Sequence, residues 1–340
     1  MKYKISVISG DGIGPEITKC SIDVIRAIEK KIDVEFDLID IEAGDSALEN
    51  NGIALSESAI KEIRNTDACI KAPVGESAME VIVKLRQLFD LYVNLRPAKS
   101  FPTVKSLEEN IDIMIVRENT EDLYKGQEFR IGDKAIALRT ISEKASTRIA
   151  KYAFNVAKSR NKKVTAVHKS NVLKMTDGLF SECVNKVAQV HKDIEFSELY
   201  VDACAMNLIR NPREFDVIVT TNMFGDILSD LASMLTGSIG MLPSASLASD
   251  GKGMYEPVHG SAPDIAGQNI ANPLATILSL SMLLKYSLGE DKLSNILEQA
   301  VSQVLTDGFR TKDIYSDGMT CVGTDEMGDA VIKTLSALLI

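Results

Sequence analysis

The chain has 340 residues, of which 45% are hydrophobic and 25% charged, which is enough for two domains that each bury a core. Its net charge of −10 argues against nucleic acid as a partner, because phosphate binding needs lysine and arginine clustered on one face. The five cysteines are widely spread and form no C-x-x-C pair, so neither a disulfide framework nor a zinc site is indicated.

Membrane insertion and secretion are not expected either. The longest apolar stretch, 273–284, is shorter than the roughly 20 residues that a membrane span needs. The opening MKYKISVISG lacks the charged, apolar and small-residue sections of a signal peptide. We therefore expect a cytoplasmic protein whose partners are small metabolites.

Short apolar runs typical of buried strands alternate with amphipathic segments along the chain. The runs are KISVIS near the start, 67–71, 111–116, 163–167 and 216–220, and helical periodicity follows at 17–30, 144–159 and 272–286. This alternation predicts an α/β architecture, and crossovers of this kind imply parallel strands. No linker rich in proline, glycine or serine interrupts the chain, so any second domain is tightly joined.

The first predicted strand is followed by GDGIGPE at residues 10–16, where a dinucleotide-binding fingerprint would be expected. Gly10 and Gly12 fit G-x-G-x-x-G, but Pro15 occupies the third glycine position. We interpret the segment as a tight turn that leads into a helix started by proline. A role in binding nucleotide phosphate is the weaker alternative.

Three arginines suit a ligand with several carboxylates. Arg86 lies at the end of a helix-like segment, and Arg96 and Arg117 lie at the ends of two strand-like segments. Each alone is typical of a surface residue. Together they would form a cluster in which each guanidinium binds a carboxylate through two parallel hydrogen bonds.

Asp226 and Asp230 follow the strand at 216–220 and lie four residues apart, so they would share one face of a helix. A solvated polar stripe is the plain interpretation, with Ile227, Leu228, Leu231 and Leu235 on the opposite apolar side. However, no lysine or arginine occurs between Arg213 and Lys252 to offset the repulsion of the two carboxylates. Oxygen ligands alone favour Mg²⁺ or Mn²⁺.

Four longer motifs add a resemblance to a known family. They are RENTEDLYKG (117–126), VHKSNVLKMTDG (167–178), VDACAMNL (201–208) and EPVHGSAPDIAGQNIANP (256–273). With them the chain resembles the β-decarboxylating dehydrogenases, which act on isopropylmalate, isocitrate, homoisocitrate or tartrate. The similarity runs from GDGIGPE to TDEMGDA near the C-terminus, and residues 75–100 are particularly similar to archaeal members that oxidise 3-isopropylmalate.

The resemblance implies a fold that differs from the Rossmann fold: two α/β domains that share a large mixed sheet. The cofactor-binding domain would comprise residues 1–99 and 237–340, and residues 100–236 would form an inserted dimerisation and catalytic domain. It also implies a homodimer with active sites shared between subunits, with a higher oligomer left open.

The resemblance also assigns roles to residues. Tyr124 and Lys169 correspond to the catalytic pair, and Asp202 corresponds to a metal ligand that comes from the neighbouring subunit together with Lys169. Asp226 and Asp230 correspond to the other metal ligands, and Arg86, Arg96 and Arg117 to the substrate arginines. A lysine near cations has a lowered pKa and can act as a base, while Tyr124 would protonate the carbon after loss of CO₂.

The loop at 256–273 resembles the cofactor loop of the family, which implies the cofactor-binding residues Glu256, His259, Gly260, Ser261, Ala262, Asp264 and Asn272. NADP-dependent relatives commonly have Lys-Tyr at 264–265, where this chain has Asp-Ile. A carboxylate at 264 accepts ribose hydroxyls but repels a 2′-phosphate by about 4 kcal/mol at contact, so NAD is predicted. A structural histidine and a helix cap are the plain alternatives for His259 and Asp264.

Substrate choice depends on the helix that a capping box at Ser77 to Glu80 should open. Its aliphatic Ile82 and Val83 suit an isopropyl group and would leave a third carboxylate unpaired. The leading hypothesis is oxidative decarboxylation of 3-isopropylmalate to 2-oxo-4-methylpentanoate in leucine biosynthesis. Oxidation of homoisocitrate or isocitrate is the alternative enzymatic function. A second alternative is an inactive regulatory subunit, but the presence of the complete set of catalytic residues argues against it.

Overall fold

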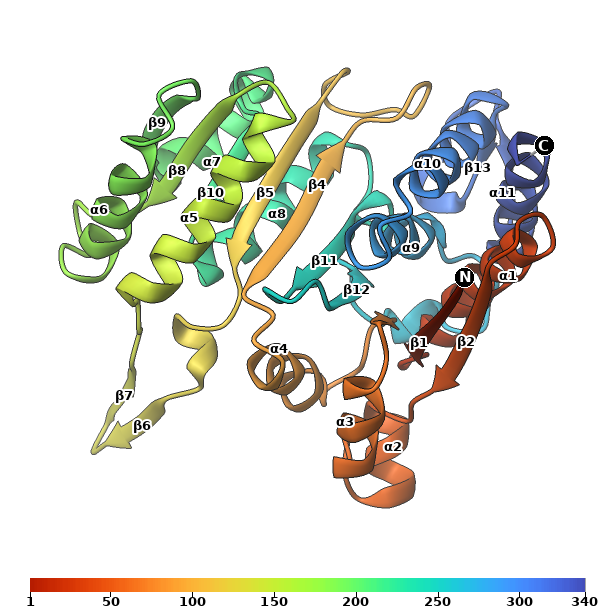
Figure 1. The fold of residues 1–340 in the computed structure, drawn as a ribbon, viewed down its shortest axis with the longest axis horizontal. Helices are drawn as coiled ribbons and strands as arrows, with labels where there is room; N and C mark the ends of the chain where they lie inside the picture. Colours follow the sequence, from red (N-terminus) through yellow and green to blue (C-terminus); the bar gives the residue numbers. More distant parts are fainter. Residues whose placement is uncertain (340) are drawn as a thin grey trace.

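A mixed sheet of ten strands crosses the molecule within residues 1–339, which the computed structural model describes (Figure 1). Its strands are β1 (Lys2–Ile8), β2 (Glu35–Asp40), β3 (Ala68–Lys71), β4 (Val93–Lys99), β5 (Asp112–Glu118), β8 (Lys163–His168), β9 (Glu195–Tyr200), β10 (Val217–Thr220), β11 (Pro243–Leu247) and β12 (Gly253–Pro257). Two separate pairs are β6 (Glu128–Ile131) with β7 (Lys134–Ala137), and β13 (Phe309–Arg310) with β14 (Thr320–Cys321).

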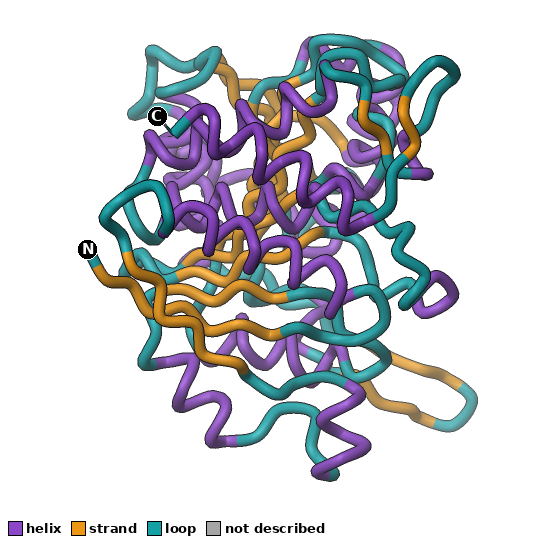
Figure 2. Tube along the Cα trace, turned by 90° about the vertical axis from the view of Figure 1, so that its right-hand side faces the viewer, coloured by secondary structure: helices purple, strands orange, loops and turns teal. Residues whose placement is uncertain are grey.

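The helices lie on both faces of the sheet (Figure 2). They are α1 (Gly14–Glu29), α2 (Asp45–Asn51), α3 (Glu57–Arg64), α4 (Lys84–Leu88), α5 (Glu143–Lys158), α6 (Thr176–Ala188), α7 (Val201–Arg210), α8 (Asn222–Leu235), α9 (Leu274–Tyr286), α10 (Asp291–Thr306) and α11 (Thr324–Leu338). A π-helix, η1 (Met79–Val83), precedes α4. Single 3₁₀ turns are η2 (Leu123–Lys125), η3 (Pro212–Glu214), η4 (Ile239–Met241), η5 (Pro263–Ile265) and η6 (Lys312–Ile314).

The strand order is β2-β1-β3-β12-β11-β4-β5-β10-β8-β9. The predicted α/β class and large mixed sheet are confirmed. As expected, the predicted strands pair in parallel, β1 with β3 and β10 with both β5 and β8. At the centre of the sheet, β12-β11-β4-β5 pair antiparallel, and three of these four strands were not among the predicted runs. The reason is local: β11 connects to β12, and β4 to β5, through loops without a crossover helix.

Both ends of the chain supply one side of this sheet, namely β1, β2, β3, β11 and β12, and the middle supplies β5, β8, β9 and β10. Strand pairing continues without a break through β4 and β5. The division into domains at residues 99 and 237 therefore stays a prediction.

The largest hydrophobic cluster lies on one face of the sheet, with side chains from α1, α5, α9, α10 and α11. Helix α9 is buried along nearly its whole length, which explains the long apolar run seen in the sequence. Three smaller clusters lie elsewhere: one under α3 and α4, one under α7 and α8, and one around Ile13 and Ile17 at the start of α1. Within residues 1–339, no helix combines the length and the apolar character needed to cross a membrane.

Candidate active site

A pocket of about 250 Å³ gathers many of the predicted site residues. Its lining includes Arg86, Arg96, Arg117, Tyr124, Asp226, Ile82, Val83, Glu256, His259 and Gly260. These residues come from η1, α4, β4, β5, η2, α8, β12 and the loop after β12. Segments that lie far apart in the sequence therefore meet at one place.

Side-chain alternation along two strands explains why Arg96 and Arg117 face this pocket. In β5, Met114 and Val116 pack into the largest cluster, so Arg117 points to the opposite face. In β4, Leu95 packs into the same cluster, so Arg96 also points to the opposite face. Both guanidinium groups reach α8, where each contacts Asp226.

The guanidinium of Arg117 is buried, and within the described part of the chain only some of its hydrogen-bond donors have a partner. Its Nε donates to Asn222 Oδ1 at 2.9 Å, its Nη1 pairs with Asp226, and its guanidinium lies 5.1 Å from the ring centre of Tyr124. Its buried Nη2 has no hydrogen-bond partner within residues 1–339. Burial, together with the nearby Arg96, lowers the pKa of Arg117 to about 9, so it stays cationic at neutral pH. An anionic ligand would satisfy the free donor.

A glycine on α8 makes room for this arginine. A Cβ atom at Gly225 would lie 2.5 Å from Cγ of Arg117, closer than side chains tolerate. Gly225 therefore permits the close approach of β5 and α8 that brings Arg117 against Asp226.

Arg86 belongs to a buried network of charges at the base of the pocket. Its Nη2 contacts Glu256 Oε1 at 3.1 Å, and Lys71 Nζ contacts Glu256 Oε2 at 2.7 Å. Burial alone would raise the pKa of Glu256, but Lys71 and Arg86 outweigh it and lower the pKa to about 2. Glu256 thus lies beside arginines that are predicted to bind substrate, and its predicted cofactor role also stays a prediction.

An apolar wall forms part of the lining of the same pocket. It consists of Val74, Ala78, Met79, Ile82 and Val83. Ile82 and Val83 belong to the π-helix η1, a form of helix that is frequent at functional sites. The wall offers an aliphatic group a place beside the arginines, which are predicted to bind carboxylates.

The predicted capping box before this helix does not form. The hydroxyl of Ser77 is buried without a partner within residues 1–339, and the residue at the cap position is Ala78. Instead, Asp45 of α2 accepts hydrogen bonds from the backbone N–H groups of Glu76 and Ser77 at 2.9 and 2.8 Å. A carboxylate from a distant segment thus replaces the local cap.

Asp226 and Asp230 lie on one side of α8, as predicted, but they differ in environment. Asp226 pairs with Arg117 and Arg96 and accepts a hydrogen bond from the hydroxyl of Tyr124. These cations outweigh burial and lower the pKa of Asp226. Within residues 1–339, the one ion pair of Asp230 is a 3.7 Å contact to Arg96, and burial raises the pKa of Asp230. Its carboxylate is thus available for a further cation.

One detail of the α8 prediction is wrong. Ile227 was placed on the apolar side of the helix, but it is among the exposed large hydrophobic residues and lies on the same face as Asp230. Leu228 and Leu235 do face the core. The exposed face of α8 is therefore partly apolar.

Lys169 and Asp202 form a separate pair. Lys169 Nζ contacts Asp202 Oδ1 at 2.5 Å, and this hydrogen bond lowers the pKa of Asp202. Neither residue lines the pocket that holds Tyr124 and Asp226. Within residues 1–339 of one subunit, no three His, Cys, Asp or Glu side chains gather as metal ligands. The predicted set with Asp202 thus does not assemble within a single chain.

The predicted cofactor loop extends away from this pocket. His259 lines the pocket, its Nε2 is buried without a partner within residues 1–339, and burial lowers its pKa. Ala262 adopts a left-handed conformation with φ 38°, and Asp264 in η5 is exposed. Asn272 is buried and donates to Asp313 Oδ2 at 3.1 Å.

The glycine-rich segment packs directly against this loop. The backbone N–H of Ile13 donates to the carbonyl of Ser261 at 2.9 Å, and a Cβ at Gly12 would lie 2.0 Å from that oxygen. Gly10 and Gly12 have positive φ, and α1 starts at Gly14 with a proline in its first turn. The segment is the tight turn that the sequence predicted.

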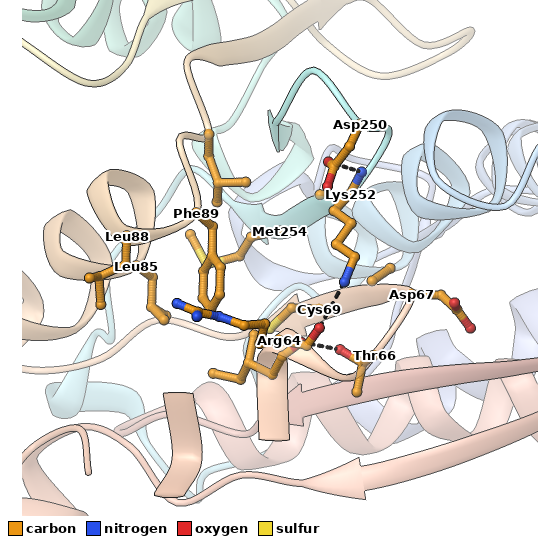
Figure 3. Close-up of a pocket in the computed structure, with 14 residues that line it drawn as sticks. Arg64, Thr66, Asp67, Cys69, Leu85, Leu88, Phe89, Asp250, Lys252 and Met254 are labelled. Carbon is orange, nitrogen blue, oxygen red and sulfur yellow. Dashed lines mark hydrogen bonds between the residues drawn. The ribbon is translucent and has the colours of Figure 1, made fainter. Parts of the chain in front are cut away.

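A second pocket of about 250 Å³ lies against Leu85, Leu88 and Phe89 of the α4 segment, and Figure 3 shows it. Arg64 lies over the ring of Phe89 at 5.6 Å, and Lys252 donates to the carbonyl of Arg64 at 2.7 Å. This pocket contains none of the residues predicted to act on substrate.

Sequence reasoning missed Lys71, which is fully buried and lines the first pocket. The available signal was a lysine at the end of the apolar run at 67–71. It also missed Arg139, whose contacts with Asp122 and Asp177 depend on tertiary structure and leave no sequence pattern.

Fold and pocket together define a mixed α/β protein with a cationic site for a small anionic molecule. The profile of the isocitrate/isopropylmalate dehydrogenase family matches residues 4–331. The chain therefore belongs to this family of dehydrogenases.

Its relatives extend over nearly the whole chain. A 3-isopropylmalate dehydrogenase of Sulfurisphaera tokodaii is 50% identical, covering 88% of this chain and 90% of that protein. A 3-isopropylmalate/3-methylmalate dehydrogenase of Methanocaldococcus jannaschii is 47% identical, with coverage of 97% and 98%. The crystal structure of an isocitrate dehydrogenase from Methylococcus capsulatus has a TM-score of 0.92 at 40% identity, covering 98% of this chain and 99% of that one.

Proposed function

We propose that this protein oxidises and decarboxylates 3-isopropylmalate to 2-oxo-4-methylpentanoate, with NAD as the hydride acceptor and Mg²⁺ or Mn²⁺ as the metal. The observation that carries the proposal is the pocket whose lining combines Arg86, Arg96 and Arg117 with aliphatic side chains. The relatives of 47–50% identity named for 3-isopropylmalate support it. Leucine biosynthesis is the corresponding pathway, and we place the enzyme in the cytoplasm.

The arginines bind and orient the carboxylates of the substrate. The unpaired Nη2 of Arg117 and the buried, unpaired Nε of Arg86 are donors that a carboxylate would accept from. Ile82 and Val83 then contact the isopropyl group, at about 0.8 kcal/mol for each buried CH₂. A third carboxylate at this wall would lose its water without gaining a partner, which disfavours isocitrate and homoisocitrate.

Asp226 and Asp230 fit a divalent metal because their carboxylates lie on one face of α8 and both contact Nη1 of Arg96, at 3.1 and 3.7 Å. Their oxygen ligands suit Mg²⁺ or Mn²⁺. When bound, the metal would act as a Lewis acid toward the oxygens of the substrate. Asp202 of a second subunit is proposed as the third carboxylate.

The exposed faces of α7 and α8 support such a dimer. On α7, Asp202 shares its face with Met206 and Ile209, which are 65% and 56% exposed. On α8, Asp230 shares its face with Ile227 and Met234, which are 57% and 56% exposed. Apolar stripes of this kind mark protein interfaces. A twofold interface that pairs α7 of one chain with α8 of the other would bring Asp202 to Asp230.

Two side chains move protons in the proposed reaction. Lys169, delivered with Asp202 by the second subunit, accepts the proton of the substrate hydroxyl. Burial raises the pKa of Tyr124, so its phenol stays protonated and can donate a proton to carbon after CO₂ leaves. Arg117 beside its ring holds the tyrosine at the pocket.

The loop at 259–272 would hold NAD, which accepts the hydride from the substrate. The buried, unpaired Nε2 of His259 is available to a ligand, and burial keeps its imidazole neutral by lowering the pKa. The exposed carboxylate of Asp264 has no ion pair within residues 1–339 and is free to accept ribose hydroxyls. A 2′-phosphate would meet it with like charge, at a cost of about 4 kcal/mol or roughly a thousandfold in binding.

One assay series tests the proposal: NADH formation from 3-isopropylmalate, homoisocitrate, isocitrate and tartrate, with metal and with chelator. We expect the highest kcat/KM for 3-isopropylmalate, loss of activity in chelator and recovery on adding Mg²⁺. Faster turnover of isocitrate would favour the alternative function, which the similar isocitrate dehydrogenase structure brings into consideration. An Asp264→Lys variant that keeps its preference for NAD would contradict the cofactor assignment.

A further inference from the structure

Arg139, in the segment between β7 and α5, binds two fully buried aspartates. Its Nε and Nη2 contact the carboxylate of Asp122 at 2.7 and 3.2 Å, and its Nη1 pairs with Asp177. Its Nη2 also donates to Thr221 Oγ1 at 2.9 Å, and its guanidinium lies 5.0 Å from the ring centre of Phe224. One side chain thus joins three segments of the chain.

The Asp122 side of this network fixes the segment of Tyr124. Asp122 has φ 71°, a left-handed conformation that is uncommon for a residue other than glycine. Its Oδ1 accepts the N–H of Leu123 at 2.9 Å, and its Oδ2 accepts the N–H of Met223 at 3.1 Å. The same carboxylate therefore holds the turn that carries Tyr124 and the start of α8, which carries Asp226.

The Asp177 side fixes the segment of Lys169. Asp177 lies in the first turn of α6, and its Oδ2 accepts the backbone N–H of Lys169 at 2.6 Å. Its other oxygen pairs with Arg139. The position of the Lys169 backbone is thus linked, through one arginine, to the turn that carries Tyr124.

We propose that Arg139 is a positioning residue that keeps the segments of Tyr124, Lys169 and α8 in one geometry. Arg139 does not line the pocket, so it acts through these segments and contacts no substrate. The proposal rests on the function proposed above. Because Lys169 is there assigned to the site of the second subunit, Arg139 links the two active sites of the dimer within each chain.

An arginine is suited to this role and a lysine is not. The planar guanidinium can donate to both oxygens of Asp122 and to Asp177 at once, whereas a lysine offers a single point charge. Arg139→Lys keeps a cation between the two buried carboxylates but cannot maintain all of these hydrogen bonds. This variant should fold, whereas Arg139→Met would leave both carboxylates without a counter-charge.

The first experiment compares Arg139→Lys with Arg160→Lys. Arg160 also bridges two aspartates, Asp112 and Asp216, at 2.8 Å each, and its side chain is 17% exposed against 13% for Arg139. Its contacts lie at the opposite ends of β5 and β10 from the site. We expect Arg139→Lys to lower kcat by ten- to a hundredfold, with KM for 3-isopropylmalate and NAD within about twofold of wild type, since each factor of ten in rate is about 1.4 kcal/mol. Equal kcat values for the two variants would overturn the proposal.

Mixed dimers test the link between sites. Consider a dimer of one Tyr124→Phe chain and one Lys169→Met chain. One of its two sites lacks both residues. The other site is intact, because it takes Tyr124 from the Lys169→Met chain and Lys169 from the Tyr124→Phe chain. Adding Arg139→Lys to the Tyr124→Phe chain then disturbs only the Lys169 segment of that site. Adding it to the Lys169→Met chain disturbs the Tyr124 segment and α8 of that site but leaves its Lys169 segment intact.

We expect Arg139→Lys to lower the activity of the mixed dimer whichever of the two chains carries it, relative to the mixed dimer without this substitution. A loss from only one placement, or from neither, would overturn the proposed link. If the parent mixed dimer has no activity at all, the shared-site part of the proposed function fails. The comparison of Arg139→Lys with Arg160→Lys in the homodimer then still decides whether Arg139 positions catalytic segments.

Discussion

At the scale of single residues, the site depends on charges that are buried yet paired. Lys71 and Glu256 are both buried and contact each other at 2.7 Å, and Arg86 completes the network. Taking such charges out of water is costly, so each depends on its partners. Substitution of one of these three residues should therefore lower the stability of the whole protein as well as change the pocket.

Glu256→Gln provides a test that depends on pH. The pKa of Glu256 falls from 4.5 to about 2 on folding, which corresponds to about 3 kcal/mol of stability. Because the folded-state pKa is the lower one, this contribution is present above pH 4.5 and is lost as pH falls toward 2. We expect the variant to have a smaller free energy of unfolding at pH 7, with the difference from wild type shrinking between pH 4.5 and 3.

Urea unfolding at several pH values measures this difference. Glu35→Gln is the matched control, because Glu35 contacts Lys2 at 2.6 Å but both side chains are exposed. Exposed pairs contribute little, so this control should unfold like wild type. A Glu256→Gln deficit that stays constant down to pH 3 would contradict the assigned ionisation.

Some residues of the site could be predicted from the sequence, because their spacing along a strand already indicates where their side chains point. Arg96 and Arg117 enter the pocket because strand alternation turns them there, and alternation is visible in a sequence. Lys71 was overlooked because a single lysine after an apolar run is usually a surface residue. Arg139 could not be found, since its partners are fixed only when the segment after β7 meets Asp122, α6 and the start of α8.

At the scale of elements, the helical segment from η1 to α4 carries Ile82, Val83 and Arg86. The sequence predicted a helix here but assigned its start to Ser77, whereas Asp45 of α2 holds the preceding turn. Tertiary contacts thus replace a local cap, and local patterns cannot reveal that. The mixed sheet followed from the family resemblance, but local patterns did not reveal which strands would pair antiparallel, because pairing partners are set by the whole fold.

Asp45→Ala should loosen this segment. The carboxylate accepts two backbone N–H groups, and losing a cap of this kind costs about 0.5–2 kcal/mol. We expect KM for 3-isopropylmalate to rise several-fold while KM for NAD changes little, as measured by steady-state kinetics. Ser56→Ala is the control: it removes the N-cap of α3, with a similar cost in stability, and should leave KM unchanged. A rise in KM that is equal in both variants would contradict the specific role of Asp45.

At the scale of the whole molecule, one chain divides the predicted machinery into two groups. Tyr124, Asp226 and the arginines lie at one pocket, while Lys169 and Asp202 form their own pair. The carboxylates Asp202 and Asp230 lie on helix faces that expose apolar side chains to solvent in the single chain. Such an arrangement is consistent with active sites completed by a second subunit.

Ile209→Asp tests whether activity requires the dimer. Ile209 on α7 and Ile53 after α2 are both 56% exposed isoleucines, so Ile53→Asp makes the same chemical change on a different surface. We expect Ile209→Asp to yield a folded monomer without NADH production, because a buried unpaired charge disfavours the interface and Asp202 no longer reaches the other chain. Ile53→Asp should remain dimeric and active. Light scattering measures mass and the NADH assay measures activity, and a fully active Ile209→Asp monomer would show that each chain holds a complete site.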